Sequence, residues 1–265
     1  MNILIILIII LIIFGIYYCY YNYYNKKNLI PKIIHQTFST KNINSDIQSN
    51  INELKKLNPG YEYHLYDDND IIDFIKENYD DNILNTYNSI NPEYGACRAD
   101  YFRYLLMYKK GGIYLDIKSS CEKPFDTIIQ SNDEFILTHW GNCGGDYNHR
   151  VIWWSDILNN EYGEYCNWNI IIRDKHPLMK KIIDQVTNNI NNYSIEKYRN
   201  GKKGVLFLTG PVAYSKIILN NKDKYNLTIY DNYYDIGLVY NKIKNYTKLF
   251  KKHYTQLESP IVLNQ

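Results

Sequence analysis

Residues 98–118 of this 265-residue chain read RADYFRYLLMYKKGGIYLDIK and give the strongest indication of its fold. Its first part predicts an amphipathic helix, because apolar and charged side chains recur at helical spacing. Gly111 and Gly112 then predict the end of the helix, and the apolar run 113–115 predicts a short buried strand. A tight return from helix to strand indicates an α/β fold.

Asp116 directly follows the predicted strand. Ligands of open α/β sheets bind beyond the carboxyl ends of the strands, so we expect Asp116 to mark a ligand site, with or without a metal. Taken alone, Asp116 could equally cap a turn. Asp100 and Arg103 lie three residues apart on the predicted helix and could form only a surface ion pair.

The same stretch resembles the sugar-donor motif of glycosyltransferase family 32, which has the approximate pattern (S/A)D..R...L...GG.Y.D.D. The matching positions are Ala99, Asp100, Arg103, Leu106, Gly111, Gly112, Tyr114 and Asp116. Shorter strings agree with the family in the expected order: IPKIIHQTF at 30–38, NPGYEYHLYDDND at 58–70, HP at 176–177 and TGP at 209–211. The chain departs from the pattern at its last acid, where Lys118 stands.

This resemblance implies a single GT-A (Rossmann-like) α/β domain with a mainly parallel sheet. It implies an enzyme that moves a hexosyl group from a nucleotide-sugar donor to a glycan, glycoprotein or glycolipid acceptor, with retention of the anomeric configuration. Negative charge grows on the departing diphosphate during such a transfer, and the family's enzymes stabilise it with Mn²⁺ or Mg²⁺. The competing interpretation is a membrane-tethered protein that binds carbohydrate or nucleotide-sugar without catalysis, a degenerate glycosyltransferase.

The resemblance also implies roles for individual donor-binding residues. Asp100 and Arg103 would contact the sugar or ribose of the donor, and Tyr114 would contact the nucleotide. Asp116 would bind the ribose and the metal, and Phe38 would lie near the base, where an aromatic ring can stack.

Lys118 leaves open whether the enzyme uses a divalent cation, because an ammonium group cannot ligate a cation. Either Asp116 holds a metal with other acceptors such as His253, which resembles a late metal-binding histidine of the family, or the ammonium of Lys118 itself supplies the positive charge. We therefore expect Asp116 and Lys118 to be the catalytic pair, and Asp116 and His253 to be the candidate metal ligands.

The N-terminal residues 3–18 are apolar or aromatic except for Gly15, a run close to the roughly 20 residues that cross a bilayer. No basic start and no A-x-A cleavage site marks a signal peptide. We therefore predict a single-pass transmembrane anchor at 1–21, a stem at 22–29 and the glycosyltransferase domain at 30–265. Lys26 and Lys27 favour a cytosolic domain, whereas the resemblance implies the lumen of the secretory pathway, in the Golgi or endoplasmic reticulum.

The sequence lacks the features that are typical of several other classes of protein. A net charge of +2 gives no argument for nucleic acid as a partner. The five cysteines show no C-x-x-C spacing, so we expect isolated buried thiols rather than a zinc site. No P-loop, G-x-G-x-x-G, G-x-S-x-G or H-E-x-x-H motif is present.

Periodicity and turn signals predict the remaining elements. We expect helices at 47–57, at 71–78 behind a capping Asp70, and at 177–190. We expect further strands at 32–38, 61–66, 135–137 and 205–208.

Overall fold

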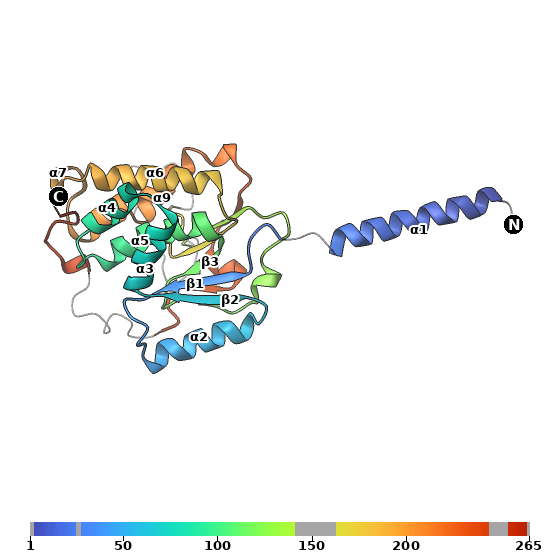
Figure 1. Ribbon diagram of the computed structural model, residues 1–265, viewed down its shortest axis with the longest axis horizontal. Helices are drawn as coiled ribbons and strands as arrows, with labels where there is room; N and C mark the ends of the chain where they lie inside the picture. The colour runs from blue at the N-terminus through green and yellow to red at the C-terminus, as the bar shows by residue number, and fades with distance from the viewer. Residues whose placement is uncertain (1–2, 25–27, 141–162, 244–253, 264–265) are drawn as a thin grey trace.

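The computed structural model describes residues 3–24, 28–140, 163–243 and 254–263 (Figure 1). Its centre is a six-stranded sheet in the order β2-β1-β3-β6-β5-β7. The strands are β1 (Ile33–Thr37), β2 (Glu62–Tyr66), β3 (Gly112–Leu115), β5 (Phe135–Thr138), β6 (Asn169–Ile172) and β7 (Thr228–Tyr230). Strand β1 runs parallel to β2 and β3, and β5 runs parallel to β7. Strand β6 is antiparallel to both of its neighbours. The predicted α/β fold with a mainly parallel sheet is confirmed.

Helices cover the sheet on both sides, with α2 on one face and a larger helical layer on the other (Figure 1). The helices of the domain are α2 (Ser45–Leu57), α3 (Asp68–Asn78), α4 (Asp81–Ser89), α5 (Gly95–Lys110), α6 (Pro177–Asn191), α7 (Ile195–Tyr198), α8 (Gly201–Leu208) and α9 (Pro211–Leu219). Short 3₁₀ turns lie at Phe125–Thr127, Lys222–Lys224, Tyr233–Ile236 and Tyr254–Gln256. A small second sheet pairs β4 (Ser120–Cys121) with β8 (Leu238–Val239).

Strand β3 lies between two hydrophobic clusters, because successive side chains of a strand point to opposite faces. Tyr114 packs in the cluster that contains the large helical layer. Ile113 and Leu115 pack in the cluster on the α2 side. All four residues of the strand are buried, so β3 positions the residue that follows it rigidly.

Helix α5 returns into β3 as predicted, through Gly111 and Gly112. The Gly111 N–H closes the helix by donating to the Met107 carbonyl at 3.0 Å, and both glycines have positive φ, 62° and 92°. The expectation that this helix is amphipathic is wrong. Its charged residues Asp100 and Arg103 are 6% and 4% exposed, because each is paired inside the protein.

Two further expectations are corrected by the structure. Asp67, rather than Asp70, caps α3, and Asp70 completes a capping box by accepting from the Asp67 N–H. Residues 205–208 form the end of helix α8 and not a strand. The apolar run alone cannot distinguish the two, but the buried positions 201, 204, 205 and 208 follow helical spacing.

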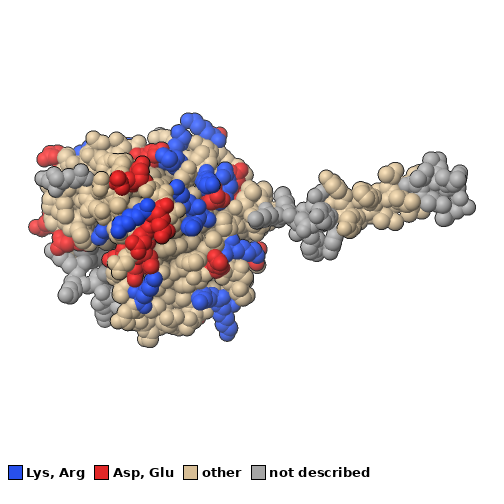
Figure 2. Space-filling view, in the orientation of Figure 1, with Lys and Arg blue, Asp and Glu red and all other residues tan. Residues whose placement is uncertain are grey.

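Helix α1 (Ile3–Tyr24) lies apart from the domain in Figure 1. Among the described residues, no helix has the length and apolar character needed to cross a membrane. The predicted transmembrane anchor is therefore not confirmed. On the face of the domain shown in Figure 2, basic and acidic side chains are interspersed and form no field of a single sign.

Candidate functional site: a buried ion network beyond strand β3

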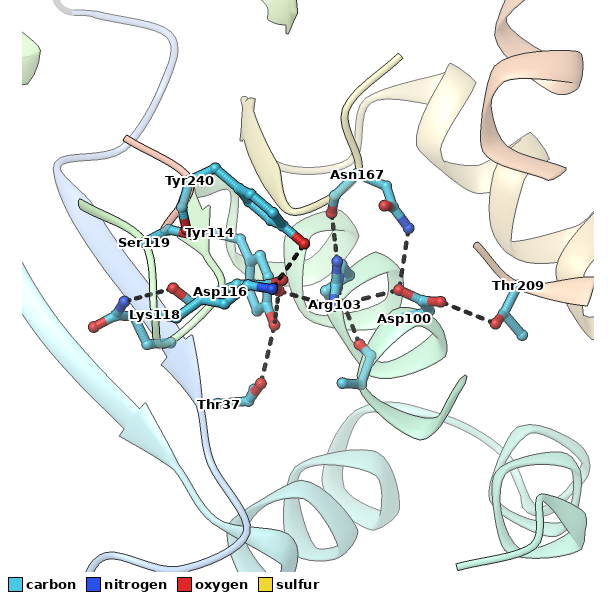
Figure 3. Close-up of polar contacts among 12 residues, drawn as sticks. Thr37, Asp100, Arg103, Tyr114, Asp116, Lys118, Ser119, Asn167, Thr209 and Tyr240 are labelled. Atoms are coloured by element: carbon cyan, nitrogen blue, oxygen red, sulfur yellow. Dashed lines mark hydrogen bonds and ion pairs between the residues drawn. The ribbon is translucent and has the colours of Figure 1, made fainter. Parts of the chain in front are cut away.

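Arg103 is the centre of a network at the carboxyl end of β3 (Figure 3). Its guanidinium lies between two carboxylates, 3.3 Å from Asp100 Oδ1 and 3.0 Å from Asp116 Oδ1. The same group donates to the main-chain oxygens of Asn167 at 2.6 Å and Ala99 at 3.3 Å. Arginine suits this position because its planar group offers several donors in fixed directions.

Asp100 is held from a second side by two neutral donors. Asn167 Nδ2 donates to Oδ1 at 3.1 Å and Thr209 Oγ1 donates to Oδ2 at 3.1 Å. Burial raises the pKa of Asp100 to about 6, even though Arg103 lowers it. Arg103, Thr209 and Asn167 favour the ionised form of Asp100, whereas Asp116, which carries the same charge, disfavours it.

The charge of Arg103 is fixed by its neighbours. Burial alone would lower the pKa of Arg103, but Asp116 and the other acidic neighbours raise it above its ordinary value. The guanidinium also stacks on the Tyr114 ring at 4.7 Å from the centroid. The network thus keeps a permanent positive charge behind the Asp116 carboxylate.

Asp116 is the member of the network that reaches towards solvent. Its side chain is 24% exposed, against 5% for Arg103 and 9% for Asp100. Its backbone is fixed, since its N–H donates to the Trp168 carbonyl at 2.9 Å and its carbonyl accepts from Gln36 Nε2 at 3.1 Å. A ligand at this edge of the sheet would therefore meet Asp116 first.

Tyr114 links the network to β1. Its hydroxyl lies 2.9 Å from Thr37 Oγ1 and donates to Asp116 Oδ1 at 3.5 Å. Burial raises the pKa of Tyr114 well above its ordinary value, so the phenol stays protonated and able to donate.

Lys118 follows Asp116 by two residues and is held by Tyr240. Its Nζ donates to the Tyr240 hydroxyl at 2.7 Å and lies 4.0 Å from the centroid of that ring (Figure 3). Burial lowers the pKa of Lys118. The negative charge of Asp116 raises that pKa, and the positive charge of Arg103 lowers it further. The ammonium group is thus a partly buried charge in a defined position beside the network.

The structure brings four of the predicted donor-binding residues together: Asp100, Arg103, Tyr114 and Asp116. Because Asp100 and Arg103 are buried, this arrangement excludes the alternative that they form only a surface ion pair. Phe38 is not in the network but packs in a small cluster that includes Ile117. His253 lies outside the described residues.

The sequence predicted no role for Asn167, Thr209 or Tyr240, which contact Asp100 or Lys118 in the structure. Thr209 begins the TGP string, whose agreement with the family pattern could have suggested a site role. Nothing local distinguishes Asn167 or Tyr240 in a chain with 29 tyrosines. Asn167 reaches the site because the antiparallel strand β6 begins beside the end of β3, and Tyr240 reaches it because β8 ends beside the start of β4.

The described residues do not fit a divalent cation well. Within residues 28–140, 163–243 and 254–263, no three His, Cys, Asp or Glu side chains gather as a possible metal site. Asp116 Oδ1 already accepts from Arg103, and the position two residues later carries an ammonium group instead of a second carboxylate. A hard cation in a protein usually needs several oxygen ligands.

Comparisons with known proteins agree with the geometry. Residues 44–135 match the family described as "Glycosyltransferase sugar-binding region containing DXD motif". Mannosyl phosphorylinositol ceramide synthase of Saccharomyces cerevisiae is 38% identical over 104 residues, which is 39% of this chain and 26% of that protein. The initiation-specific alpha-1,6-mannosyltransferase of Candida albicans is 29% identical over 49% of this chain and 34% of its own length. The chain thus spans only about a quarter to a third of these relatives.

Longer matches exist at lower identity. An uncharacterized glycosyltransferase of Acanthamoeba polyphaga mimivirus is 26% identical over 71% of this chain and 67% of that protein. The solved UDP-bound glycosyltransferase domain of the YGT toxin superposes with a TM-score of 0.52 at 8% identity, over 79% of this chain and 82% of that domain. That likeness shows a shared glycosyltransferase-type α/β fold. Residues 44–135 thus match the sugar-binding region of the DXD glycosyltransferases, which confirms the predicted resemblance to family 32.

Proposed function

We propose that this protein transfers a hexosyl group from a nucleotide-sugar donor to a hydroxyl group of a glycan, glycoprotein or glycolipid, with retention of the anomeric configuration. The observation that carries the proposal is the buried Asp100–Arg103–Asp116 network at the carboxyl end of β3. The names of the similar proteins make a mannosyl group the first to test, and an inositol phosphoceramide lipid one of the first acceptors.

Each member of the network has a distinct role in this proposal. Asp116 is the partly exposed carboxylate that hydrogen-bonds to the nucleotide-sugar donor. Arg103 holds the Asp116 carboxylate in place from the interior side, and the Tyr114 hydroxyl donates a second hydrogen bond to that carboxylate. Direct contacts of Asp100 and Phe38 with the donor stay predictions, as does metal binding by Asp116 and His253.

The test is hydrolysis of the donor by the full chain in detergent. We expect the protein to release free sugar slowly from one member of a panel of UDP- and GDP-hexoses, because water can replace the acceptor hydroxyl. Asp116→Asn should reduce the rate by about 100-fold, typical of losing one preorganised polar contact in an active site. Asp126→Asn is the matched control, since Asp126 is an exposed acid paired only with surface groups.

Two outcomes would contradict the proposal. Full activity of Asp116→Asn would place the site elsewhere. Binding of a donor without release of sugar, and without transfer to any acceptor, would favour the non-catalytic carbohydrate- or nucleotide-sugar-binding protein.

We also propose that helix α1 attaches the domain to a membrane as a single N-terminal anchor, with a stem at 22–29 and the catalytic domain at 30–265. The support is the row of apolar side chains from Ile8 to Tyr18, of which Leu11 is 71% and Phe14 68% exposed. Exposed apolar surface of this extent is costly in water. We expect the full chain to sediment with membranes after a carbonate wash and a chain without residues 1–24 to stay in the supernatant. Equal partition of the two chains would exclude the anchor.

A further inference from the structure

Hydrogen bonds from two sides fix the backbone around Lys118. The Ser119 hydroxyl donates to the Tyr240 carbonyl at 2.7 Å, and the Lys242 N–H donates to the Lys118 carbonyl at 2.9 Å. On the other side, Asn50 Nδ2 of α2 donates to the carbonyls of Ile117 at 3.2 Å and Ser119 at 3.0 Å. The backbone of the loop after β3 is therefore clamped between α2 and the segment after β8.

The partner of the ammonium group is equally well fixed. Tyr240 packs against two tryptophans, with ring centroids 4.7 Å from Trp140 and 5.1 Å from Trp168. Its hydroxyl and ring face both contact Lys118 Nζ. A lysine on an open surface loses side-chain entropy to adopt one position, whereas Lys118 is already ordered before any ligand arrives.

The position of this charge matches the chemical need of the proposed reaction. The bond between the anomeric carbon and a diphosphate oxygen breaks, and the electron pair stays on that oxygen. The new bond joins the anomeric carbon to the acceptor oxygen, whose proton passes to the departing diphosphate or to water. A preorganised positive charge beside the diphosphate stabilises the negative charge that develops there.

We propose that the Lys118 ammonium group, oriented by Tyr240, binds the diphosphate of the donor and takes the place of the divalent cation of the DXD enzymes. The proposal rests on the proposed function and specifies how its site works. Lys118 acts by charge alone and neither forms a covalent bond nor gives up its proton. Tyr240 is a positioning residue.

The experiment measures binding rather than activity. Isothermal titration of the full chain in detergent gives Kd for UDP and for GDP, each in EDTA and in MnCl₂. We expect one nucleotide to bind in EDTA with an affinity that Mn²⁺ does not improve. Lys118→Met should weaken that binding by about 10- to 100-fold, the worth of one hydrogen bond to a charged group. Tyr240→Phe should weaken it less, because the ring that orders the lysine stem remains.

Matched variants distinguish the loss of the Lys118 charge from a loss of folding as the cause of weaker binding. Lys118→Arg keeps the positive charge and should retain most of the affinity. Lys242→Met removes an exposed lysine of the same segment, paired with Glu53 at 3.4 Å, and should change nothing. Lys118→Asp restores the second acid of the motif, and its binding should become dependent on Mn²⁺.

The outcomes also separate this inference from the proposed function. Binding of a nucleotide only with Mn²⁺ would overturn the role of Lys118 and leave the glycosyltransferase intact. Unchanged affinity of Lys118→Met in EDTA, with thermal unfolding like that of the unmodified chain, would overturn it as well. No binding of UDP or GDP under either condition would instead overturn the proposed function.

Discussion

A single arginine compensates two buried or half-buried carboxylates in this protein. An unpaired charge in the interior is strongly destabilising, so Asp100 could not remain ionised at its site without Arg103. Arg103 in turn uses its remaining donors on the Asn167 and Ala99 carbonyls. The network is thus satisfied on all sides, which is the condition under which a buried ion pair persists.

The ionisation of Asp100 predicts a specific dependence of stability on pH. Its folded pKa of about 6 lies above the ordinary value of 3.8, so the folded state binds this proton more tightly than the unfolded state. The contribution of Asp100 to the free energy of unfolding is therefore greatest below pH 4, falls between pH 4 and 6, and is constant above. Asp100→Asn should abolish this fall.

Urea denaturation at pH 4, 5, 6 and 7 measures the effect. The difference in unfolding free energy between the unmodified chain and Asp100→Asn should shift steadily between pH 4 and 6 and then level off. Asp184, an exposed acid paired with Lys180 on the surface of α6, provides the matched control variant Asp184→Asn. A difference that is constant from pH 4 to 7 would show that Asp100 titrates normally.

At the scale of elements, the turn from α5 to β3 sets the position of the whole site. Gly112 has a φ of +92°, and a Cβ there would lie 2.5 Å from the Ile33 carbonyl oxygen of β1. The close approach allows Ile113 to pair with Ile34 in the parallel register of β1 and β3. The same register brings Gln36 to the Asp116 carbonyl.

Gly112→Ala should therefore destabilise the protein. Backbone strain at positive φ costs about 1–3 kcal/mol, and displacement of the β1 carbonyl adds to it. Gly60→Ala is the matched control, since a Cβ at Gly60 meets nothing within 4 Å. Chemical denaturation would measure both. Equal stability of the two variants would show that β3 can shift away from β1 without cost.

At the scale of the whole molecule, tyrosine hydroxyl groups join distant segments of the chain. Tyr104 donates to the Thr209 carbonyl at 2.8 Å, 105 residues away, and Tyr94 donates to the Ser259 carbonyl at 2.7 Å, 165 residues away. Tyr104 also stacks on Tyr214 of α9, with ring centroids 5.5 Å apart. These aromatic rings fill the helical layer, and their hydroxyl groups donate hydrogen bonds to backbone oxygens that a phenylalanine could not make.

The features that could be predicted from the amino-acid sequence are those that depend on neighbours along the chain. The helix-to-strand turn at Gly111 and Gly112, the carboxylate after β3 and the family were all evident from it, because turn chemistry and short motifs are local. Short apolar runs without a clear period were not: the helical end of α8 was mistaken for a strand, since only its burial pattern reveals the helix.

Which charges are buried, and which distant residues complete the site, follow from the tertiary fold. Asp100 and Arg103 look like surface groups on a helix, but the layer formed by α6, α8 and α9 encloses them. The pairing of β4 with β8 brings Tyr240 to Lys118 across 122 residues. Such contacts arise from the topology of the sheet, and no pattern of neighbouring residues encodes them.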